Sequence, residues 1–191
     1  FVFVDRPAPY LDADSVTVDN RGGITACLDH LLEQGSKSIA ILADTPSIWT
    51  ASERIEAFKQ AMLSRKLDKK NVHIISDIHT SEQAGSATKK LLKEHPEVDG
   101  IIATNDLIAM GVGQTVSASK LNVKVVSFDL FPTANLLNID TLDHDPQRLG
   151  RMSAELLLKR FENPTERSFS TQIMKVSMRS SNHDSEGSAS L

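Results

Sequence analysis

The sequence predicts an α/β fold in which helices cover both faces of a parallel sheet. Short apolar runs typical of buried strands alternate along the 191 residues with segments whose apolar side chains recur at helical spacing. The segments between successive strands are long enough to hold the crossover helix that parallel strands require. Polar residues follow the strands directly, and ligands of open parallel sheets bind at that end of the strands.

The first half of the chain contains four short segments that are predicted as strands because they are rich in β-branched and other apolar residues, at residues 1–4, 15–18, 38–43 and 72–75. We expect Asn20 to cap the helix that follows the second strand and Gly35 to end it. The apolar residues of this helix recur at the spacing of one helix face: Ile24, Cys27, Leu28, Leu31 and Leu32. We expect Ser52 to cap the next helix, after a loop that carries Trp49.

The second half continues the same alternation. A helix is expected to end near Pro96, and it leads to a short apolar strand at residues 100–103. Thr104 or Asn105 is expected to cap the helix that follows. Further elements are predicted as strands at residues 123–128, 138–142 and 171–178, with a helix over 147–161. The segment 180–191 contains five serines and no aromatic residue, so we expect it to be disordered.

Composition excludes several classes of protein. The chain is 40% hydrophobic and 24% charged with a net charge of −4, which is ordinary for a globular protein and argues against a general nucleic-acid-binding surface. No apolar run approaches the ~18 residues of a membrane span. The one cysteine, Cys27, is expected in the core and fits a reducing cytoplasm. The six histidines show no metal-ligand spacing, so neither a metal nor a cofactor is expected.

Polar residues at the strand ends predict a ligand site. Because the carboxyl ends of parallel strands meet at one sheet edge, we expect these residues to converge on a cleft: Asp5, Asp44, Asp77 with His79, Asn105 and Asp129. For Asn105 alone, helix capping is the more common role. Arg54 is unusual because the first turn of a helix disfavours a cation, so either a nearby glutamate or a ligand is expected to balance it. The residues alone leave these two alternatives open.

Five segments, taken in sequence order, carry a family resemblance. They are FVFVDRP at residues 1–7, VTVDNRGGITACLDHLLEQGSKSIAIL at 16–42, SERIEAF at 52–58, ATNDLIAMGV at 103–112 and VVSFD at 125–129. Together they resemble the LacI/GalR family of bacterial transcription regulators over about residues 1–180. Ser36, Ala57 and Ser127 depart from the family pattern, which leaves the identity of the effector open.

The resemblance implies a two-lobed, periplasmic-binding-protein-like core of parallel, doubly wound sheets. Residues 1–19 would be the end of the N-terminal lobe, and residues 20–143 would be the C-terminal lobe. Residues 144–164 would be a return helix of the N-terminal lobe, and residues 165–179 a final strand of the C-terminal lobe. Phe1 falls within a strand-like run, so we expect a helix-turn-helix head and the first part of the N-terminal lobe upstream of it. With so little of that lobe present, five apolar residues are expected to stay exposed: Phe1, Phe3, Leu149, Met152 and Leu156.

The resemblance also implies roles for single residues. Arg54 matches the family arginine that hydrogen-bonds the effector. Trp49 would either stack on a sugar or pack as part of a lid, and a plain surface role stays open for His79. Residues expected to bind a small carbohydrate-like effector are Arg54, Asn105, Asp129, Asp5, Trp49, Thr50 and His79.

Taken together, the resemblance predicts the effector-binding and dimerisation core of a cytoplasmic LacI/GalR-type repressor. Effector binding would change lobe closure and so control operator DNA binding by the upstream head. A homodimer is expected, to which residues 130–138 contribute because that segment is more apolar than a solvated loop. The alternative is a periplasmic sugar-binding protein of an uptake system, which shares the fold. An enzyme is not expected, because phosphate-binding glycine loops and nucleophile motifs are absent from the sequence.

Overall fold

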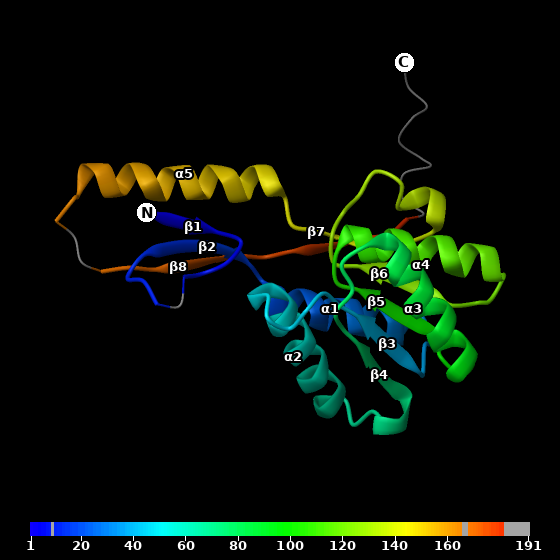
Figure 1. The fold of residues 1–191 in the computed structure, drawn as a ribbon. Coiled ribbons are helices and arrows are strands. Elements are labelled where there is room, and N and C mark those ends of the chain that lie inside the picture. Colours follow the sequence, from blue (N-terminus) through cyan, green and yellow to red (C-terminus); the bar gives the residue numbers. More distant parts are fainter. Residues whose placement is uncertain (9, 166–167, 182–191) are drawn as a thin grey trace, which may run out of the picture.

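The computed structural model describes residues 1–8, 10–165 and 168–181, which form a large and a small sheet with helices packed on them (Figure 1). The large sheet has six strands in the order β4-β3-β5-β6-β7-β9, and the small sheet has three in the order β1-β2-β8. The strands are β1 (Val2–Val4), β2 (Asp14–Val18), β3 (Ile39–Leu42), β4 (Val72–Ile75), β5 (Gly100–Ala103), β6 (Lys124–Ser127), β7 (Asp140–Asp143), β8 (Thr171–Met174) and β9 (Ser177–Arg179).

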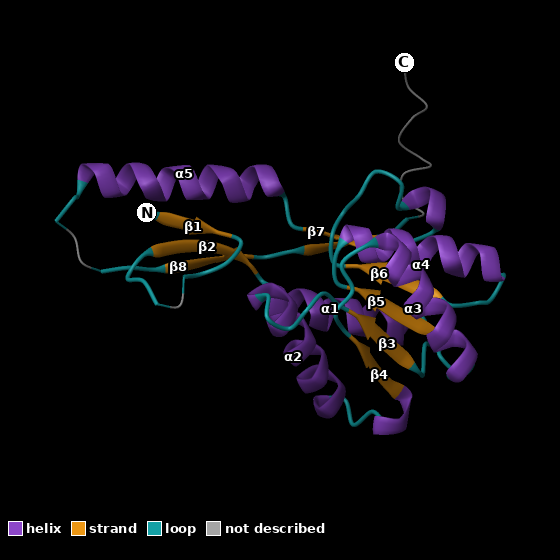
Figure 2. Ribbon diagram, in the orientation of Figure 1, coloured by secondary structure: helices purple, strands orange, loops and turns teal. Residues whose placement is uncertain are grey.

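Figure 2 shows the helices packed around the two sheets, and helices and strands alternate along the chain from β2 to β6. They are α1 (Asn20–Glu33), α2 (Trp49–Ser64), α3 (Ser81–Glu94), α4 (Asp106–Ser119) and α5 (Pro146–Glu162), with 3-10 turns at Lys69–Asn71 and Asn135–Leu137. The strand pairs are parallel except for β7 with β9. The predicted α/β class with parallel, helix-wound sheets is therefore confirmed.

The central strands β3 and β5 of the large sheet are covered on both faces, which explains why they are buried and apolar along their whole length. Ile39 and Ile41 of β3 pack in one apolar cluster with residues of α1 and α2. Ala40 and Leu42 of the same strand pack in a second cluster with residues of α3 and α4. Successive side chains of a strand point to opposite faces, so a strand buried on both sides needs apolar residues at every position. Figure 1 shows the two helix pairs on opposite sides of the sheet.

The small sheet is covered by α5. Leu149 and Leu156 of this helix are each 8% exposed, so the expectation that they stay exposed is wrong. β1 and β2 provide enough apolar surface to cover this face of the helix. Arg160 of α5 also forms an ion pair with Asp14, with Nη2 of Arg160 2.9 Å from Oδ1 of Asp14. Asp14 is fully buried at the start of β2, so this ion pair fastens the helix to the sheet.

The C-terminal segment differs from the prediction of one closing strand over residues 171–178. The structure has two short strands there: β8 pairs parallel to β2 in the small sheet, and β9 pairs antiparallel to β7 in the large sheet. Residues 165–179 therefore do not form a final strand of the C-terminal lobe alone. Lys175 and Val176 carry the chain from one sheet to the other. The alternation of apolar and polar residues over this segment is weak, and it is not interrupted where the chain crosses from one sheet to the other. The sequence therefore does not show that the segment holds two strands.

Two helices begin earlier than predicted. Asp19, and not Asn20, caps α1, because its Oδ1 accepts a hydrogen bond of 2.8 Å from the N–H of Gly22. α2 begins at Trp49, ahead of the predicted cap at Ser52, and no side chain caps it. α4 is capped by Asn105, one of the two predicted residues, whose Oδ1 accepts a hydrogen bond of 2.9 Å from the N–H of Ile108.

The predicted disordered tail begins too early. The N–H and hydroxyl of Ser181 donate hydrogen bonds of 2.7 and 3.0 Å to Oδ1 of Asp140, so this residue is held against the start of β7. The remainder of the predicted tail, residues 182–191, lies outside the described residues. Within the described ranges, no helix has the length and apolar character needed to cross a membrane.

Candidate functional site

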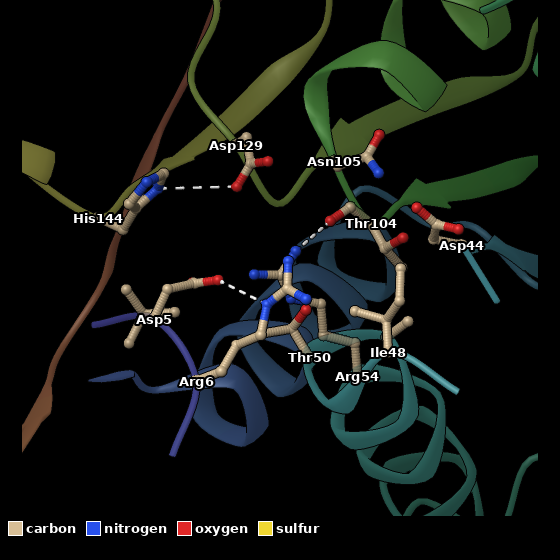
Figure 3. A pocket seen from close by; sticks show the side chains of 12 residues that line it. Asp5, Arg6, Asp44, Ile48, Thr50, Arg54, Thr104, Asn105, Asp129 and His144 are labelled. Carbon is tan, nitrogen blue, oxygen red and sulfur yellow. Dashed lines mark hydrogen bonds and ion pairs between the residues drawn. The ribbon is translucent and has the colours of Figure 1, made fainter. Parts of the chain in front are cut away.

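A cavity of about 260 Å³ lies between the small sheet and the carboxyl-end edge of the large sheet (Figure 3). Its wall includes residues that follow β1, β3, β5 and β6, the first turns of α2, and the connection from β7 to α5. The lining residues are Asp5, Arg6, Val18, Asp44, Ile48, Thr50, Ala51, Arg54, Thr104, Asn105, Asp129 and His144. This is the sheet edge at which the sequence predicts a polar cleft.

Arg54 is the most buried charge in the wall, with 8% of the residue exposed. Its Nε donates a hydrogen bond of 2.8 Å to Oδ1 of Asn20, and its Nη1 donates to the backbone oxygen of Thr104. Its Cζ lies 3.7 Å from the centre of the Phe128 ring, at which distance a guanidinium and an aromatic ring attract each other. These contacts fix the guanidinium plane and leave Nη2 without a hydrogen-bond partner in the described part of the chain.

The position of Arg54 on its helix differs from the prediction. Because α2 begins at Trp49, Arg54 lies in the second turn, beyond the strongest effect of the helix dipole. Burial lowers the pKa of the Arg54 guanidinium, whereas the charges of Asp129 and Asp5 raise it. An arginine remains cationic under such conditions. The positive charge of Arg54 is therefore balanced by the oxygens of Asn20 and Thr104 and by carboxylates on two sides of the cavity.

Asp129 follows β6 and reaches the cavity beside His144 (Figure 3). Burial raises the pKa of the Asp129 carboxyl, against the opposing charges of Arg54 and His144. Its Oδ1 lies 3.8 Å from Nδ1 of His144, which is too long for a hydrogen bond. That nitrogen is buried and has no hydrogen-bond partner among the residues described. The Asp129 carboxylate can therefore accept a hydrogen bond from a ligand, and the His144 nitrogen can donate or accept one according to its tautomer.

Asp5 and Arg6 form the part of the wall that belongs to the small sheet. Asp5 follows β1 and has a φ of 70°, a left-handed conformation that aspartate tolerates better than most residues. Its N–H donates a hydrogen bond of 2.9 Å to the backbone oxygen of Val16, which holds the turn in place. Nε of Arg6 lies 3.5 Å from Oδ2 of Asp5, and both side chains are about half exposed. This wall therefore presents one carboxylate and one guanidinium.

Four other predicted residues have different outcomes. Asn105 and Thr50 line the cavity, and Asn105 also caps α4, so its predicted roles as cap and wall residue coexist. Trp49 and His79 are not in the wall. Trp49 is adjacent in sequence to Thr50, and His79 is exposed, with its Nδ1 2.7 Å from Oδ1 of the wall residue Asp44.

Sequence reasoning missed part of the wall. Arg6 directly follows the strand-end Asp5, which was a signal that could have been used. Asp44 was predicted as a strand-end residue but not as a ligand contact. Ile48 carried no local signal, because its position depends on where α2 begins. His144 carried only a weak signal, as a residue where the chain crosses between the lobes.

The wall chemistry suits a ligand rich in hydroxyl groups. Carboxylates accept hydrogen bonds, guanidinium groups donate them, and the Asn105 amide does both, so together they can bind both sides of a hydroxyl. Val18, Ile48 and Ala51 supply apolar surface for carbon-bound hydrogens. The arrangement therefore fits a polar, hydroxyl-bearing ligand.

A sequence model of the periplasmic binding protein-like domain family matches residues 28–182. The chain belongs to this family. Among curated relatives, the ribose operon repressor of Halalkalibacterium halodurans and the HTH-type transcriptional regulator MalR of Streptococcus pneumoniae are each 31% identical over 153 residues. These matches cover 77% and 79% of this chain but 45% and 44% of the relatives, so the chain spans less than half of their length.

This chain shares its fold with a solved structure. It is a LacI family transcriptional regulator from Enterococcus faecium with bound ribose, and its TM-score to this chain is 0.81 at 21% sequence identity. The match covers 94% of this chain and 68% of that chain. The predicted periplasmic-binding-protein-like fold and the resemblance to LacI-type regulators are confirmed. The relatives are transcriptional regulators, not enzymes, in agreement with the expectation that this chain is not an enzyme.

Proposed function

We propose that this chain is the effector-binding domain of a LacI-type transcriptional regulator and binds a small sugar or related polyhydroxylated molecule in the cavity. The observation that carries the proposal is the arrangement around Arg54. A buried guanidinium with one nitrogen available faces the same cavity as Asp129 and Asp5, which belong to different sheets. The ribose operon repressor and the ribose-bound solved structure support a sugar as the ligand class.

A ligand in this cavity would contact elements of both sheets at once. Asp5 and Arg6 follow β1 of the small sheet, whereas Asn105 and Asp129 follow strands of the large sheet. If the ligand binds more tightly to one arrangement of the two sheets than to another, it shifts the protein toward that arrangement. We propose that this shift controls operator DNA binding by a DNA-binding head of the whole protein in the cytoplasm.

We also propose a homodimer to which residues 130–138 contribute. Phe131 and Ala134 are buried at 5% and 2% exposure and anchor the segment to the core. Leu130 and Leu136 are 46% and 82% exposed. An anchored segment that presents exposed leucines is a suitable contact for a second copy.

Titration of the chain with a panel of pentoses, hexoses and disaccharides tests the ligand class. We expect saturable binding of at least one sugar by calorimetry, with one ligand per chain. The chain has a single tryptophan, Trp49, next to the wall residues Ile48 and Thr50, so its fluorescence should change over the same titration. Failure of every sugar in the panel to bind contradicts the proposal.

A periplasmic sugar-binding protein is the alternative, because it would use the same cavity. The curated relatives, which are transcriptional regulators, favour the proposed function. Sugar binding alone does not separate the two. Sugar-dependent binding of operator DNA by the whole protein supports the regulator, and sugar binding without any DNA binding supports the alternative.

A further inference from the structure

Three possible metal ligands meet at the edge of the large sheet opposite the cavity. His73 is the second residue of β4, His95 is the residue that ends α3, and Glu97 lies in the turn before β5. The cavity lies at the carboxyl ends of the strands, whereas these residues lie near their amino ends. The cluster therefore belongs to a different part of the molecule from the proposed sugar site.

The ligand atoms already lie close to the spacing that a tetrahedral ion imposes. Oε1 of Glu97 is 3.2 Å from Nδ1 of His95 and 3.7 Å from Nε2 of His73. All three ligand atoms lie within 4.8 Å of one another. Zinc bonds of ~2.0–2.1 Å at tetrahedral angles set neighbouring ligand atoms about 3.4 Å apart. Small side-chain rotations therefore bring the three atoms onto one ion.

His73 provides an independent reason to expect a ligand. Its side chain is 12% exposed, and its Nε2 is buried without a hydrogen-bond partner among the residues described. Buried imidazole nitrogens normally have a partner. This nitrogen lies near the carboxylate of Glu97 and beside the His95 ring, whose centre is 4.1 Å from that of His73. A cation at the centre of the cluster supplies the partner that Nε2 lacks.

We propose that His73, His95 and Glu97 bind a divalent transition-metal ion of the zinc type. Two imidazoles and one carboxylate are the ligands that zinc, nickel and copper accept, whereas magnesium and calcium prefer oxygen ligands alone. His73 and His95 also line a hollow of about 370 Å³, from which water can supply the fourth ligand. The ion joins β4, an edge strand that pairs only with β3 within the described sheet, to the connection between α3 and β5.

Zinc binding to the 191-residue chain tests the proposal. We expect one zinc ion per chain by calorimetry and a rise in the melting temperature when zinc chloride is added, because an ion that binds only the folded chain stabilises it. His73→Gln and His95→Asn keep polar side chains but remove the imidazole ligand. Each should weaken zinc binding at least about tenfold and abolish most of the rise in melting temperature.

His30→Gln is the matched control. His30 also lies beside a carboxylate, with Nε2 2.6 Å from Oδ2 of Asp140, but it is outside the cluster. The control variant should bind zinc like the unchanged chain. Glu97→Gln alters an exposed residue, so it tests the site even where His73→Gln impairs folding. Cobalt in place of zinc should give the intense visible bands of a tetrahedral site, and these bands should be lost in His95→Asn.

Two results would overturn the proposal. One is zinc affinity that is unchanged in His95→Asn and Glu97→Gln. The other is a zinc site that is lost in His30→Gln and kept in the cluster variants. Neither result bears on the sugar site, since no residue of the cluster lines the cavity.

Discussion

Replacement of Asp129 by asparagine should separate ligand binding from stability. Burial raises the pKa of the Asp129 carboxyl, which means that the ionised side chain is destabilised in the folded protein. An amide of the same shape carries no charge to desolvate, so the melting temperature should stay the same or rise. Ligand binding should weaken by ~1.5–3 kcal/mol, or about 10- to 150-fold, because a charged hydrogen bond to a ligand hydroxyl is lost.

Asp140→Asn is the matched control, because the same substitution should have the opposite effect there. Burial raises the pKa of Asp140, but hydrogen bonds from His30 and Ser181 outweigh it and hold the pKa below its usual range. The folded state therefore favours the ionised form, and its loss should lower the melting temperature. Asp140 lies outside the cavity wall, so sugar affinity should not change.

Calorimetry with the sugar identified from the panel and thermal unfolding followed by circular dichroism measure the two effects. The pH dependence offers a further check of sign. A raised folded-state pKa means that the contribution of Asp129 to stability is largest at low pH and is lost as the pH rises through that pKa. A large fall in melting temperature for Asp129→Asn, with unchanged sugar affinity, would refute the reasoning and make Asp129 a structural residue.

Four further substitutions test the fold and the assembly. Hydrogen bonds from Arg160 hold the pKa of Asp14 below its usual range, so Asp14→Asn should lower the free energy of unfolding by ~3 kcal/mol at pH 7. In the unchanged chain, the contribution of this ion pair should be lost as the pH falls below about 4. Urea unfolding of both chains at pH 7 and below about pH 4 checks both expectations. Gly150→Ala should stabilise the chain by ~0.5–1 kcal/mol, because the new methyl group meets nothing within 4 Å. Gly111→Ala should destabilise the chain, because the methyl group would overlap the backbone of α3. Equal effects of the two substitutions on the melting temperature would contradict the packing of α3 on α4. Leu136→Glu should shift the proposed dimer toward monomer, because it places a charge on the exposed apolar part of the contact. Sedimentation that shows no change would argue against residues 130–138 as the contact.

Most elements of the fold could be predicted because their patterns are local. β4 and β5 fall at the residues expected from their apolar patterns, and β5 is buried along its whole length. The end of the chain could not be predicted in the same way. β8 and β9 join different sheets, and that choice depends on partners far away in the sequence, β2 and β7.

The candidate site was only partly predictable for a similar reason. Asn105 and Asp129 follow the neighbouring strands β5 and β6, so the shared edge of the large sheet brings them together, whereas Asp5 reaches the cavity from the small sheet. Arg54 was singled out partly for a wrong local reason, since α2 begins earlier than expected. The cluster at His73 was not predicted, because its ligands come from a strand, a helix end and a turn and show no sequence spacing.

The central claim is that one sugar binds between the two sheets, and hydrogen–deuterium exchange with and without the bound sugar tests it most directly. The account predicts that sugar slows exchange in segments of both sheets, around Asp5 and Arg6 on one side and around Asn105 and Asp129 on the other, with Arg54 between them. Slower exchange confined to one side, or located around His73 and His95 instead, would contradict it.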